Sequence, residues 1–292
     1  MISFNKFNHN TRVIGVIGHP IKHSFSPLMH NISLEMNGIE YIYLPFDVPD
    51  NQLKDAIRGM VALQFVGLNV TLPHKEKIIQ YLNNVSEEAN VIGAVNTIVN
   101  ENGNLSGYNT DVNGIYATLE NFKEDISGNV ISVFGAGGAA RSAIYTAIRF
   151  FNPEKINIIN RTVEKAESLK DYFSEKMLFE NIEIFELIPP DLTDTLQESK
   201  LIINATSIGM SPEVDDCPIA TAEGFNDNQI VFDIVYNPLQ TKFLSLAESK
   251  GAKTLNGLKM FVEQGAKSFE LWTGQQMNKE KIYKTLANYL ST

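Results

Sequence analysis

A glycine-rich turn at residues 134–140, FGAGGAA, joins a run of apolar residues to a segment with helical spacing. Gly135, Gly137 and Ala140 have the G-x-G-x-x-A spacing, with VISVFG before them as a strand and AARSAIYTAIRFF after them as a helix. In that context the first glycine permits a tight turn, and the second lets the backbone approach a pyrophosphate at the helix N-terminus. The small third residue lets the helix pack closely against the strand. The pattern predicts a dinucleotide site; the alternative is a glycine-rich turn that binds nothing.

Strand-like and helix-like segments alternate on both sides of this turn. From the strand before this turn onward, the expected strands are residues 130–135, 155–161, 200–206 and 229–236. Upstream, the expected strands are residues 12–18, 41–48 and 65–71, the expected helices start at Pro27 or span 51–63 and 75–82, and residues 94–110 suggest a hairpin. Such alternation predicts α/β architecture with a mostly parallel sheet.

The order of these segments predicts two domains. An N-terminal α/β domain is expected from residues 1–110 plus 258–292, and a Rossmann-type, doubly wound dinucleotide-binding domain from residues 111–257. Residues 258–290 look helical, with a break near Thr273 and Gly274. We expect these C-terminal helices to return to the first domain, because neither they nor residues 1–110 look complete alone.

The end of the second strand of the dinucleotide domain indicates which cofactor binds. An NAD site places Asp or Glu there to accept the ribose hydroxyls, but here the residues are Asn160, Arg161 and Thr162. Arg161 can pair with a 2′-phosphate and Thr162 can donate to it, with Lys165 one turn along the next helix. The pattern favours NADP; a solvated arginine at a strand end is the alternative.

Composition excludes several classes of protein. The net charge of −10 argues against nucleic-acid binding, which needs clustered Lys and Arg. The most apolar stretch, residues 130–148, contains Arg141 and several glycines and does not resemble a membrane span. A single cysteine, Cys217, and an N-terminus without a signal-peptide pattern fit a cytoplasmic protein.

Two polar segments in the first half could bind an acidic substrate. In HSFSP, Ser24 and Ser26 precede a helix and would face the same way in an extended segment, so both hydroxyls could hold a carboxylate; simple capping by Ser26 is the alternative. In NVTLPHK, Thr71 ends a strand and Lys75 opens the predicted helix. A positive charge at a helix start is disfavoured, which suits a proton donor or acceptor. An ordinary surface lysine is the alternative.

Two further polar segments lead into the dinucleotide domain. GAVNT places Asn96 at a strand position, and GYNTD ends at Asp111, where the chain crosses between the predicted domains. Substrate and nicotinamide meet between domains in such enzymes, so a converging Lys75 and Asp111 would form an acid/base pair. Asp111 could equally cap the helix that starts near Val112.

The histidines do not predict a metal site. The chain has no HExxH motif and no cysteine pair, and Pro20 opposes a helix that would align His19 with His23. We expect His74 to be a surface or helix-start residue.

Together these segments resemble the shikimate dehydrogenase family along nearly the whole chain. The segments that carry the resemblance are HSFSP, NVTLPHK, GAVNT, GYNTD, GAGGAA, NRT, NATSIGM and GLKMFVEQ, in that order. The resemblance implies reversible, NADP-dependent reduction of 3-dehydroshikimate to shikimate, in aromatic amino-acid (chorismate) biosynthesis, by a monomer or homodimer.

The resemblance also implies roles for individual residues. Lys75 would be the acid/base residue, assisted by Asp111. The implied substrate residues are Ser24, Ser26, Thr71, Lys75, Asn96, Asp111, Tyr236 and Gln264. The implied cofactor residues are Gly135, Ala136, Gly137, Gly138, Ala139, Asn160, Arg161, Thr162, Lys165, Thr206, Ile234, Gly257, Met260 and Glu87. No metal is implied.

Two other functions stay open. A quinate/shikimate dehydrogenase with relaxed cofactor use is one; relatives that accept NAD carry an acid soon after the NRT arginine, and here Glu164 is the first. A non-catalytic NADP-binding regulator is the other, although it would have no need of both Lys75 and Asp111.

Overall fold

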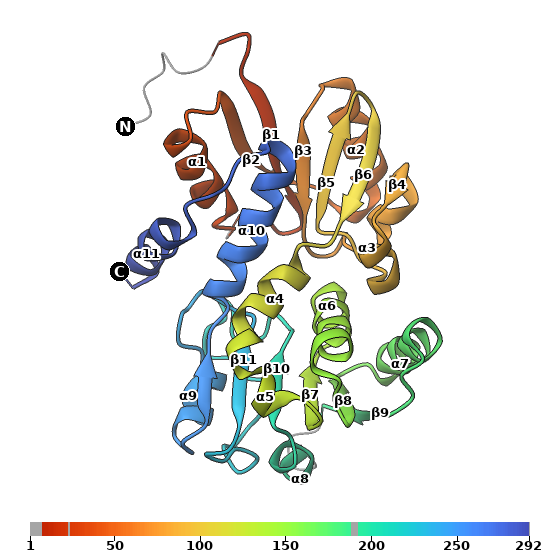
Figure 1. The fold of residues 1–292 in the computed structure, drawn as a ribbon, viewed down its shortest axis with the longest axis vertical. Helices are drawn as coiled ribbons and strands as arrows, with labels where there is room; N and C mark the ends of the chain where they lie inside the picture. The colour runs from red at the N-terminus through yellow and green to blue at the C-terminus, as the bar shows by residue number, and fades with distance from the viewer. Residues whose placement is uncertain (1–7, 23, 188–191, 292) are drawn as a thin grey trace. The chain divides into compact units, whose positions relative to one another are not determined.

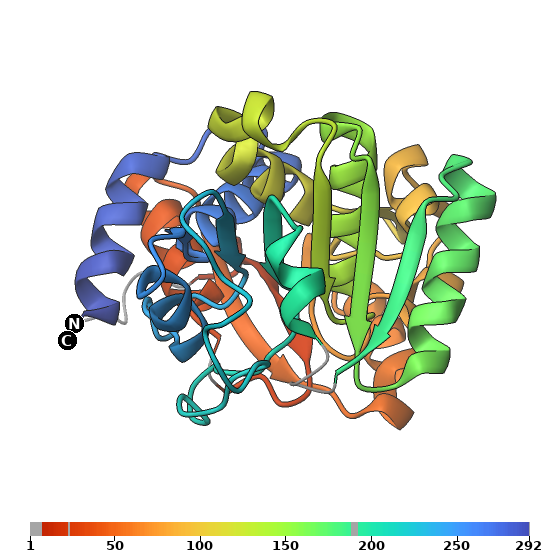
Figure 2. The same ribbon diagram turned by 90° about the horizontal axis from the view of Figure 1, so that it is seen from below.

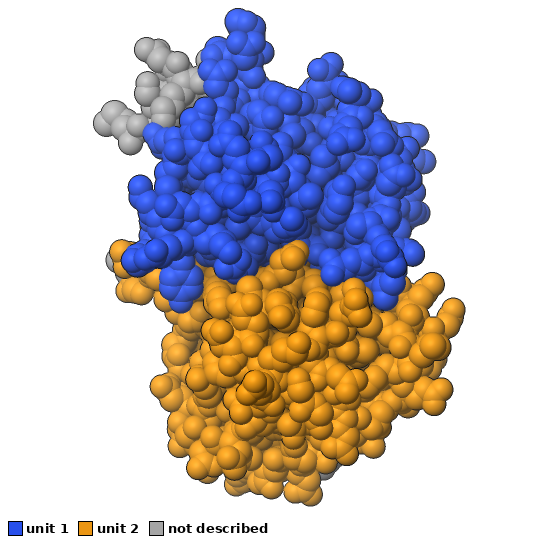
Figure 3. Space-filling view, viewed as in Figure 1, with its two compact units in different colours: residues 1–110, 262–286 blue, residues 111–261, 287–292 orange. Residues whose placement is uncertain are grey.

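The computed structural model describes residues 8–22, 24–187 and 192–291. The chain divides into two compact units, coloured separately in Figure 3. Unit 1 comprises Met1–Thr110 and Val262–Leu286, and unit 2 comprises Asp111–Phe261 and Ala287–Thr292. Each unit is built on a six-stranded sheet. None of the helices among these described residues is long and apolar enough to cross a bilayer.

The sheet of unit 1 is mixed, with strand order β2-β1-β3-β5-β6-β4. Its strands are β1 (Arg12–Gly18), β2 (Tyr41–Asp47), β3 (Gly67–Val70), β4 (Asn84–Val85), β5 (Thr97–Glu101) and β6 (Asn104–Tyr108). Strands β1, β2 and β3 are parallel, as the alternating pattern predicts, but β5 is antiparallel to both β3 and β6. The predicted hairpin is therefore confirmed, with Asn102 and Gly103 at φ 55° and 90° in its turn. This hairpin makes the sheet mixed instead of mostly parallel.

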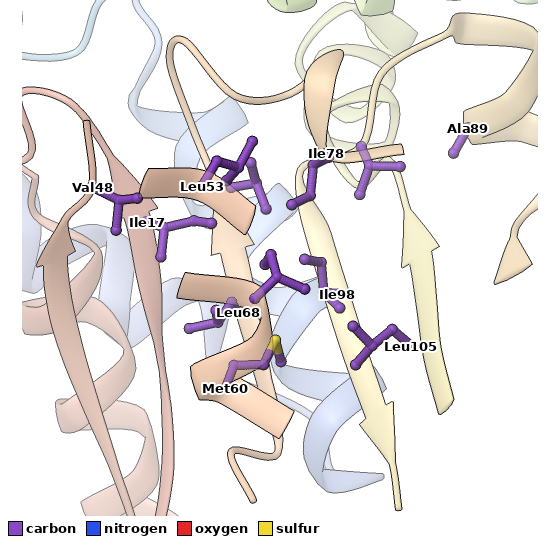
Figure 4. Close-up of a cluster of buried hydrophobic side chains, with 12 residues drawn as sticks. Ile17, Val48, Leu53, Met60, Leu68, Ile78, Ala89, Ile98 and Leu105 are labelled. Atoms are coloured by element: carbon purple, nitrogen blue, oxygen red, sulfur yellow. The ribbon is translucent and has the colours of Figure 1, made fainter. Parts of the chain in front are cut away.

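Helices cover both faces of this sheet (Figure 1). They are α1 (Ser26–Met36), α2 (Leu53–Ala62), α3 (Glu87–Ile92) and, from the C-terminal region, α10 (Leu258–Thr273). The last helix, α11 (Lys279–Leu290), follows α10 after a break at residues 274–278. On one face, Leu53 and Met60 of α2 pack against Leu68 and Ile98 of the sheet (Figure 4). On the other face, the Trp272 indole N–H of α10 donates to the Ile98 carbonyl at 2.9 Å. The C-terminal helices thus return to the first sheet, as predicted.

Two local predictions in unit 1 are wrong. Ser26 is the first residue of α1 and not its N-cap; the cap position is Phe25, which makes no side-chain capping bond. The predicted helix at residues 75–82 is only the 3₁₀ helix η3 (Lys77–Tyr81), and Lys75 lies in the turn before it. One short 3₁₀ turn does not carry the aligned dipoles of an α-helix, so the helix-start argument for Lys75 does not apply.

The sheet of unit 2 is entirely parallel, with strand order β12-β11-β10-β7-β8-β9. Its strands are β7 (Val130–Phe134), β8 (Lys155–Asn160), β9 (Ile182–Glu186), β10 (Leu201–Asn204), β11 (Ile230–Asp233) and β12 (Lys253–Leu255). The helices between them are α4 (Asp111–Leu119), α5 (Lys123–Ile126), α6 (Gly138–Thr146), α7 (Val163–Met177), α8 (Thr193–Gln197) and α9 (Lys242–Glu248). Figure 2 shows these strands edge to edge, with α7 beside β9. This is the predicted doubly wound, Rossmann-type sheet.

The strand order reverses between β7 and β10. From β7 the chain builds outward through β8 and β9, and from β10 it builds the other way through β11 and β12. In open parallel sheets, ligands bind beyond the carboxyl ends of the strands at such a switch point. The segments that follow β7 and β10 are therefore the candidate ligand-binding segments of unit 2.

Candidate active site

The glycine turn of unit 2 lies at this switch point. Gly135 follows β7 with a φ of 107°, a conformation that side-chain-bearing residues rarely adopt. A Cβ at Gly135 would lie 3.1 Å from the Thr206 methyl and 3.2 Å from the Ala205 carbonyl, both in the segment after β10. The two predicted cofactor residues Gly135 and Thr206 are thus brought into close contact.

The start of α6 fits the pyrophosphate of a dinucleotide. Gly137 is the N-cap of α6, and the first intrahelical bond runs from the Arg141 N–H to its carbonyl at 3.0 Å. The N–H groups of Gly138 and Ala139 precede that bond, where an α-helix leaves donors for an anion. A Cβ at Gly137 would meet nothing within 4 Å, so its own fold does not require glycine there. The open space beside Gly137 leaves room for a ligand group such as a pyrophosphate.

Residues after β8 form an exposed basic edge. Arg161 and Thr162 follow the strand, and Lys165 lies in the first turn of α7; all three are exposed. The Asn160 amide donates to the Thr162 carbonyl at 2.7 Å and shapes this turn. Guanidinium and ammonium groups at this place can hold a phosphate ester and supply no carboxylate for ribose hydroxyls.

A second set of predicted residues gathers after β11. Gly257 packs so closely on Ile234 that a Cβ at Gly257 would lie 2.0 Å from the Ile234 carbonyl oxygen. The Tyr236 ring stacks on Phe261, with ring centroids 4.2 Å apart. Met260 lies against Gly114 of α4, where a Cβ at Gly114 would meet the Met260 carbonyl at 2.5 Å. Met260 thus has a packing role in this structure.

A buried carboxylate in the same region is not among the residues predicted from the sequence. Asp233, the last residue of β11, is fully buried and accepts hydrogen bonds from Asn204, Val235 and Thr241. Burial raises the pKa of Asp233 to about 6, while the hydrogen bonds from Thr241, Val235 and Asn204 oppose that rise. An aspartate that ends a buried strand, in IVFD, is the signal that could have identified it.

In unit 1 the predicted substrate residues gather at one edge of the sheet. Ser24 follows β1 and Thr71 follows β3, and these parallel strands end at the same edge. A Cβ at Gly18, the last residue of β1, would lie 2.4 Å from the Thr71 methyl. The ends of β1 and β3 are therefore in close contact. The Lys75 carbonyl accepts from the Val95 N–H at 2.8 Å, which ties the third loop to the start of β5.

Ser24 and Ser26 are neighbours, although for another reason than the one predicted. The segment is not extended, because Ser26 already belongs to α1. Instead the Ser26 N–H donates to the Ser24 hydroxyl oxygen at 3.3 Å. Ser24 is half-buried and Ser26 is buried. His23 lies outside the described residues.

Asn96 joins the GAVNT and GYNTD segments. Its side-chain oxygen accepts from the Thr110 N–H at 2.7 Å, and its amide donates to the Thr110 hydroxyl at 3.0 Å. Asn109 adds a bond from its amide to the Ala94 carbonyl at 2.9 Å. Asp111, buried and the first residue of α4, follows directly. The network therefore holds the chain where it passes from unit 1 to unit 2.

Helix α10 contributes to the same network. The Ser268 hydroxyl lies 2.8 Å from the Thr97 hydroxyl and 3.1 Å from that of Thr110, and it donates to the Gln264 carbonyl at 3.1 Å. Gln264, half-buried, thus lies one turn from the Asn96 network. Glu87, in contrast, lies in the first turn of α3 on an exposed surface, where a negative charge suits the helix N-terminus.

His74 is not a surface residue, which corrects the prediction. Its side chain is fully buried, and Nε2 lies 2.6 Å from the Val48 carbonyl, so Nε2 carries the proton. Nδ1 lies 3.4 Å from the Asp50 carboxylate. His74 therefore anchors the turn that carries the half-buried Lys75. Among the described residues, no group of three or more His, Cys, Asp or Glu side chains could hold a metal.

A Rossmann-type unit with this glycine turn, joined to an α/β unit with polar side chains at one sheet edge, defines a two-domain, dinucleotide-dependent oxidoreductase. Three family models then match the chain: the shikimate dehydrogenase substrate binding domain at residues 16–98, shikimate/quinate 5-dehydrogenase at 117–235 and the shikimate 5′-dehydrogenase C-terminal domain at 257–287. The chain belongs to the shikimate dehydrogenase family.

Individual relatives agree over nearly the full length. A shikimate dehydrogenase (NADP⁺) from Caldanaerobacter subterraneus is 44% identical over 283 residues, which is 96% of this chain and 98% of the relative. A crystal structure of a shikimate dehydrogenase in complex with NADP⁺ has a TM-score of 0.88 at 42% identity, covering 98% of both chains. The Thermus thermophilus enzyme in complex with NADP(H) and shikimate has a TM-score of 0.81 at 34% identity, covering 96% of this chain and 99% of its own.

Proposed function

We propose that the protein catalyses the reversible, NADP-dependent reduction of 3-dehydroshikimate to shikimate. The close contact of Gly135 with Thr206 at the switch point of unit 2 carries the cofactor half of this proposal. The substrate half is supported by family membership and by the polar sheet edge of unit 1. Residues 1–110 and 258–292 would form the substrate domain, and residues 111–257 the NADP domain.

In unit 1, Ser24 and Ser26 would bind the substrate carboxylate through their neighbouring hydroxyls. Thr71, Asn96 and Gln264 would bind its hydroxyl groups, with Asp111 and Tyr236 contributed by unit 2. Lys75 would donate a proton to the carbonyl oxygen during reduction and remove it during oxidation, with Asp111 as its partner. Holding the substrate in one orientation relative to the cofactor supplies much of the remaining acceleration.

In unit 2, residues Gly135 to Ala139 would hold the pyrophosphate at the start of α6. Asn160, Arg161, Thr162 and Lys165 would hold the 2′-phosphate, and Thr206, Ile234, Gly257 and Met260 the rest of the dinucleotide; Glu87 of unit 1 would approach it. When bound, NADP(H) supplies the hydride chemistry. The residues of the chain contribute binding, orientation and the proton.

One assay tests the proposal. Protein mixed with shikimate and NADP should produce the absorbance of reduced nicotinamide. Replacing shikimate with quinate, or NADP with NAD, should lower the rate. Comparable rates with quinate and NAD would instead favour the relaxed quinate/shikimate dehydrogenase. NADP binding without turnover of either acid would favour a non-catalytic regulator.

Lys75→Ala tests the acid/base role. We expect turnover to fall by roughly 10²–10⁴-fold with substrate binding largely kept, because general acid/base catalysis contributes about that much. Lys54→Ala, which changes an exposed lysine of α2 in the same unit, is the control and should behave like the wild type. Near-normal turnover in Lys75→Ala would remove Lys75 from the mechanism.

Arg161→Ala tests the choice of cofactor. Losing the guanidinium should weaken NADP binding far more than NAD binding, because only NADP carries the 2′-phosphate. Arg149→Ala removes another exposed arginine of unit 2 and should leave both affinities unchanged. Equal weakening of both cofactors in Arg161→Ala would refute the assignment.

We propose a cytoplasmic location, which the single cysteine supports. A monomer or a homodimer would suit this reaction, and sedimentation equilibrium distinguishes them.

A further inference from the structure

Asp233 lies beneath the predicted cofactor loops of unit 2, and the proposed reaction gives it no role. Its Oδ1 accepts from the Asn204 amide and from the Val235 N–H, each at 3.0 Å. Its Oδ2 accepts from the Thr241 hydroxyl at 2.6 Å. One fully buried carboxylate thus receives three donors from three segments of the chain.

One arm of this cluster leads to the glycine turn. Asn204 pairs with Asp233 across β10 and β11, and its side-chain oxygen accepts from the Thr206 N–H at 3.1 Å and the Thr206 hydroxyl at 2.6 Å. Thr206 in turn lies against Gly135. The position of Thr206 beside the glycine turn therefore depends on the orientation of the Asn204 side chain, which the hydrogen bond to Asp233 fixes.

The other arms lead to the segment after β11. Val235, held through its N–H, accepts from the Gly257 N–H at 3.0 Å, and Ile234 packs directly on Gly257. The Thr241 hydroxyl, which donates to Asp233, also accepts from the Leu244 N–H and caps α9. The same carboxylate therefore sets the places of Thr206, Ile234 and Gly257, three of the proposed cofactor residues.

We propose that Asp233 is a positioning residue for the cofactor, and that its ionised carboxylate holds the segments after β10 and β11 in the arrangement that binds the dinucleotide. The inference rests on the proposed function only in taking these segments as the NADP site. It does not depend on the identity of the substrate.

The chemistry of the cluster explains why ionisation matters. A carboxylate only accepts, and three donors point at it; a protonated acid would direct its own hydrogen at one of them. If the acid hydrogen pointed at the Thr241 oxygen, the Thr241 hydroxyl hydrogen would lose its acceptor on Asp233. Cys217 and Lys242 are the titratable neighbours of this cluster. Burial and, to a smaller extent, the charge of Asp233 raise the pKa of the Cys217 thiol, and the charge of Lys242 lowers it.

Asp233→Asn is the central test, because the amide resembles the protonated acid in shape and charge. We expect its dissociation constant for NADP, measured by calorimetric titration at pH 7.5, to rise by about ten-fold, the effect of losing one charged hydrogen bond. Turnover at saturating NADP and the KM for shikimate should change less than about two-fold. Thr241→Val should weaken NADP binding in the same direction, and Thr241→Ser should restore it. Thr195→Val, at a buried threonine of α8, is the control and should bind NADP normally.

A pH series separates positioning from general packing. NADP affinity of the wild type should fall as the pH is lowered through about 6, because Asp233 protonates there. The 2′-phosphate of NADP titrates near the same pH, about 6, so the Asp233→Asn profile provides the phosphate contribution alone. The difference between the two profiles belongs to Asp233, and at pH 5 the two affinities should converge.

A folded Asp233→Asn protein that binds NADP as tightly as the wild type at pH 7.5 would overturn the inference. If Asp233→Asn does not fold, Thr241→Val and the wild-type profile decide instead, and normal binding by Thr241→Val overturns it. Wild-type protein that binds NADP but does not oxidise shikimate would refute the proposed substrate and leave the test of Asp233 intact. Wild-type protein that does not bind NADP would overturn both.

Discussion

Gly135 and Gly137 of the dinucleotide turn differ in what their own backbone requires. Gly135 has a φ of 107° and little space for a Cβ beside Thr206, so the fold itself needs glycine there. Gly137 has a φ of −100° and open space, so any residue could adopt its conformation. The proposed ligand, and not the fold, would explain glycine at Gly137.

The pair Gly135→Ala and Gly137→Ala separates these two requirements. Gly135→Ala should lower the free energy of unfolding by about 1–3 kcal/mol, the usual cost of a strained backbone conformation. Gly137→Ala should change it by less than about 0.5 kcal/mol but weaken NADP binding by at least about ten-fold, because a methyl group would occupy the pyrophosphate position. Urea unfolding and NADP titration of both variants measure this. Normal NADP affinity in Gly137→Ala would place the pyrophosphate elsewhere.

At the scale of elements, helix α10 is fastened to the sheet of unit 1 by buried hydroxyl and amide groups. Ser268 contacts Asn69, Thr97 and Thr110, and Asn69 also accepts from the Tyr43 hydroxyl at 2.7 Å. These groups lie on the face of β3 opposite Leu68, because successive strand residues alternate between the two faces. The polar network therefore replaces apolar packing under the predicted substrate residue Asn96.

Ser268→Ala should test how much this network stabilises unit 1. Losing the hydroxyl leaves buried donors and acceptors on Asn69 and Thr97 short of a partner, at a cost of about 1–3 kcal/mol. Ser33→Ala is the matched control: Ser33 is equally buried on α1, but its hydroxyl only donates to the Met29 carbonyl within the same helix at 2.9 Å. Its loss should cost less than about 1 kcal/mol. Equal losses in urea unfolding would show that the network adds nothing.

The elements that could be predicted from sequence are those whose pattern is local. Strands such as β7 (VISVF) and β10 (LIIN) are mostly apolar, which is typical of parallel strands buried on both faces. The segment at residues 75–82 has helical spacing over too few residues to distinguish an α-helix from the 3₁₀ helix that forms. His74 was misplaced for a different reason: its partner is the Val48 carbonyl, 26 positions away in the chain.

The candidate site divides in the same way. Gly135 and Arg161 are found by local motifs, because backbone approach and charge are properties of the segment itself. Asp233 and Asn204 are 29 positions apart, and only the register of β10 with β11 brings them together. A residue that acts through such pairing has no motif of its own.

At the scale of the whole molecule, each unit contains a buried acid-sensitive group, and the pKa values of these two groups are shifted in opposite directions. In unit 1, His30 is fully buried and stacks on Tyr43 with ring centroids 4.4 Å apart, and burial lowers its pKa from 6.5 to about 3. Below pH 6.5 the unfolded chain therefore takes up a proton that the folded unit refuses, so unit 1 loses stability as the pH falls. In unit 2, the pKa of Asp233 is raised from 3.8 to about 6, so the folded unit takes up the proton first and gains stability between pH 6 and 4.

Acid should therefore weaken unit 1 and spare unit 2. At about 1.4 kcal/mol per pKa unit, unit 1 should lose about 2 kcal/mol between pH 6.5 and 5, whereas unit 2 should gain about 1 kcal/mol between pH 6 and 5. Trp272, the single tryptophan and buried in unit 1, reports urea unfolding of that unit by fluorescence, and hydrogen exchange of β10 and β11, corrected for the intrinsic rate, reports unit 2. His30→Phe keeps an aromatic ring but cannot titrate, so it should remove the pH dependence of the Trp272 transition in this range. Asp233→Asn should abolish the gain in unit 2 and leave Trp272 unchanged. An unaltered pH dependence in His30→Phe would mean that another group makes unit 1 sensitive to acid.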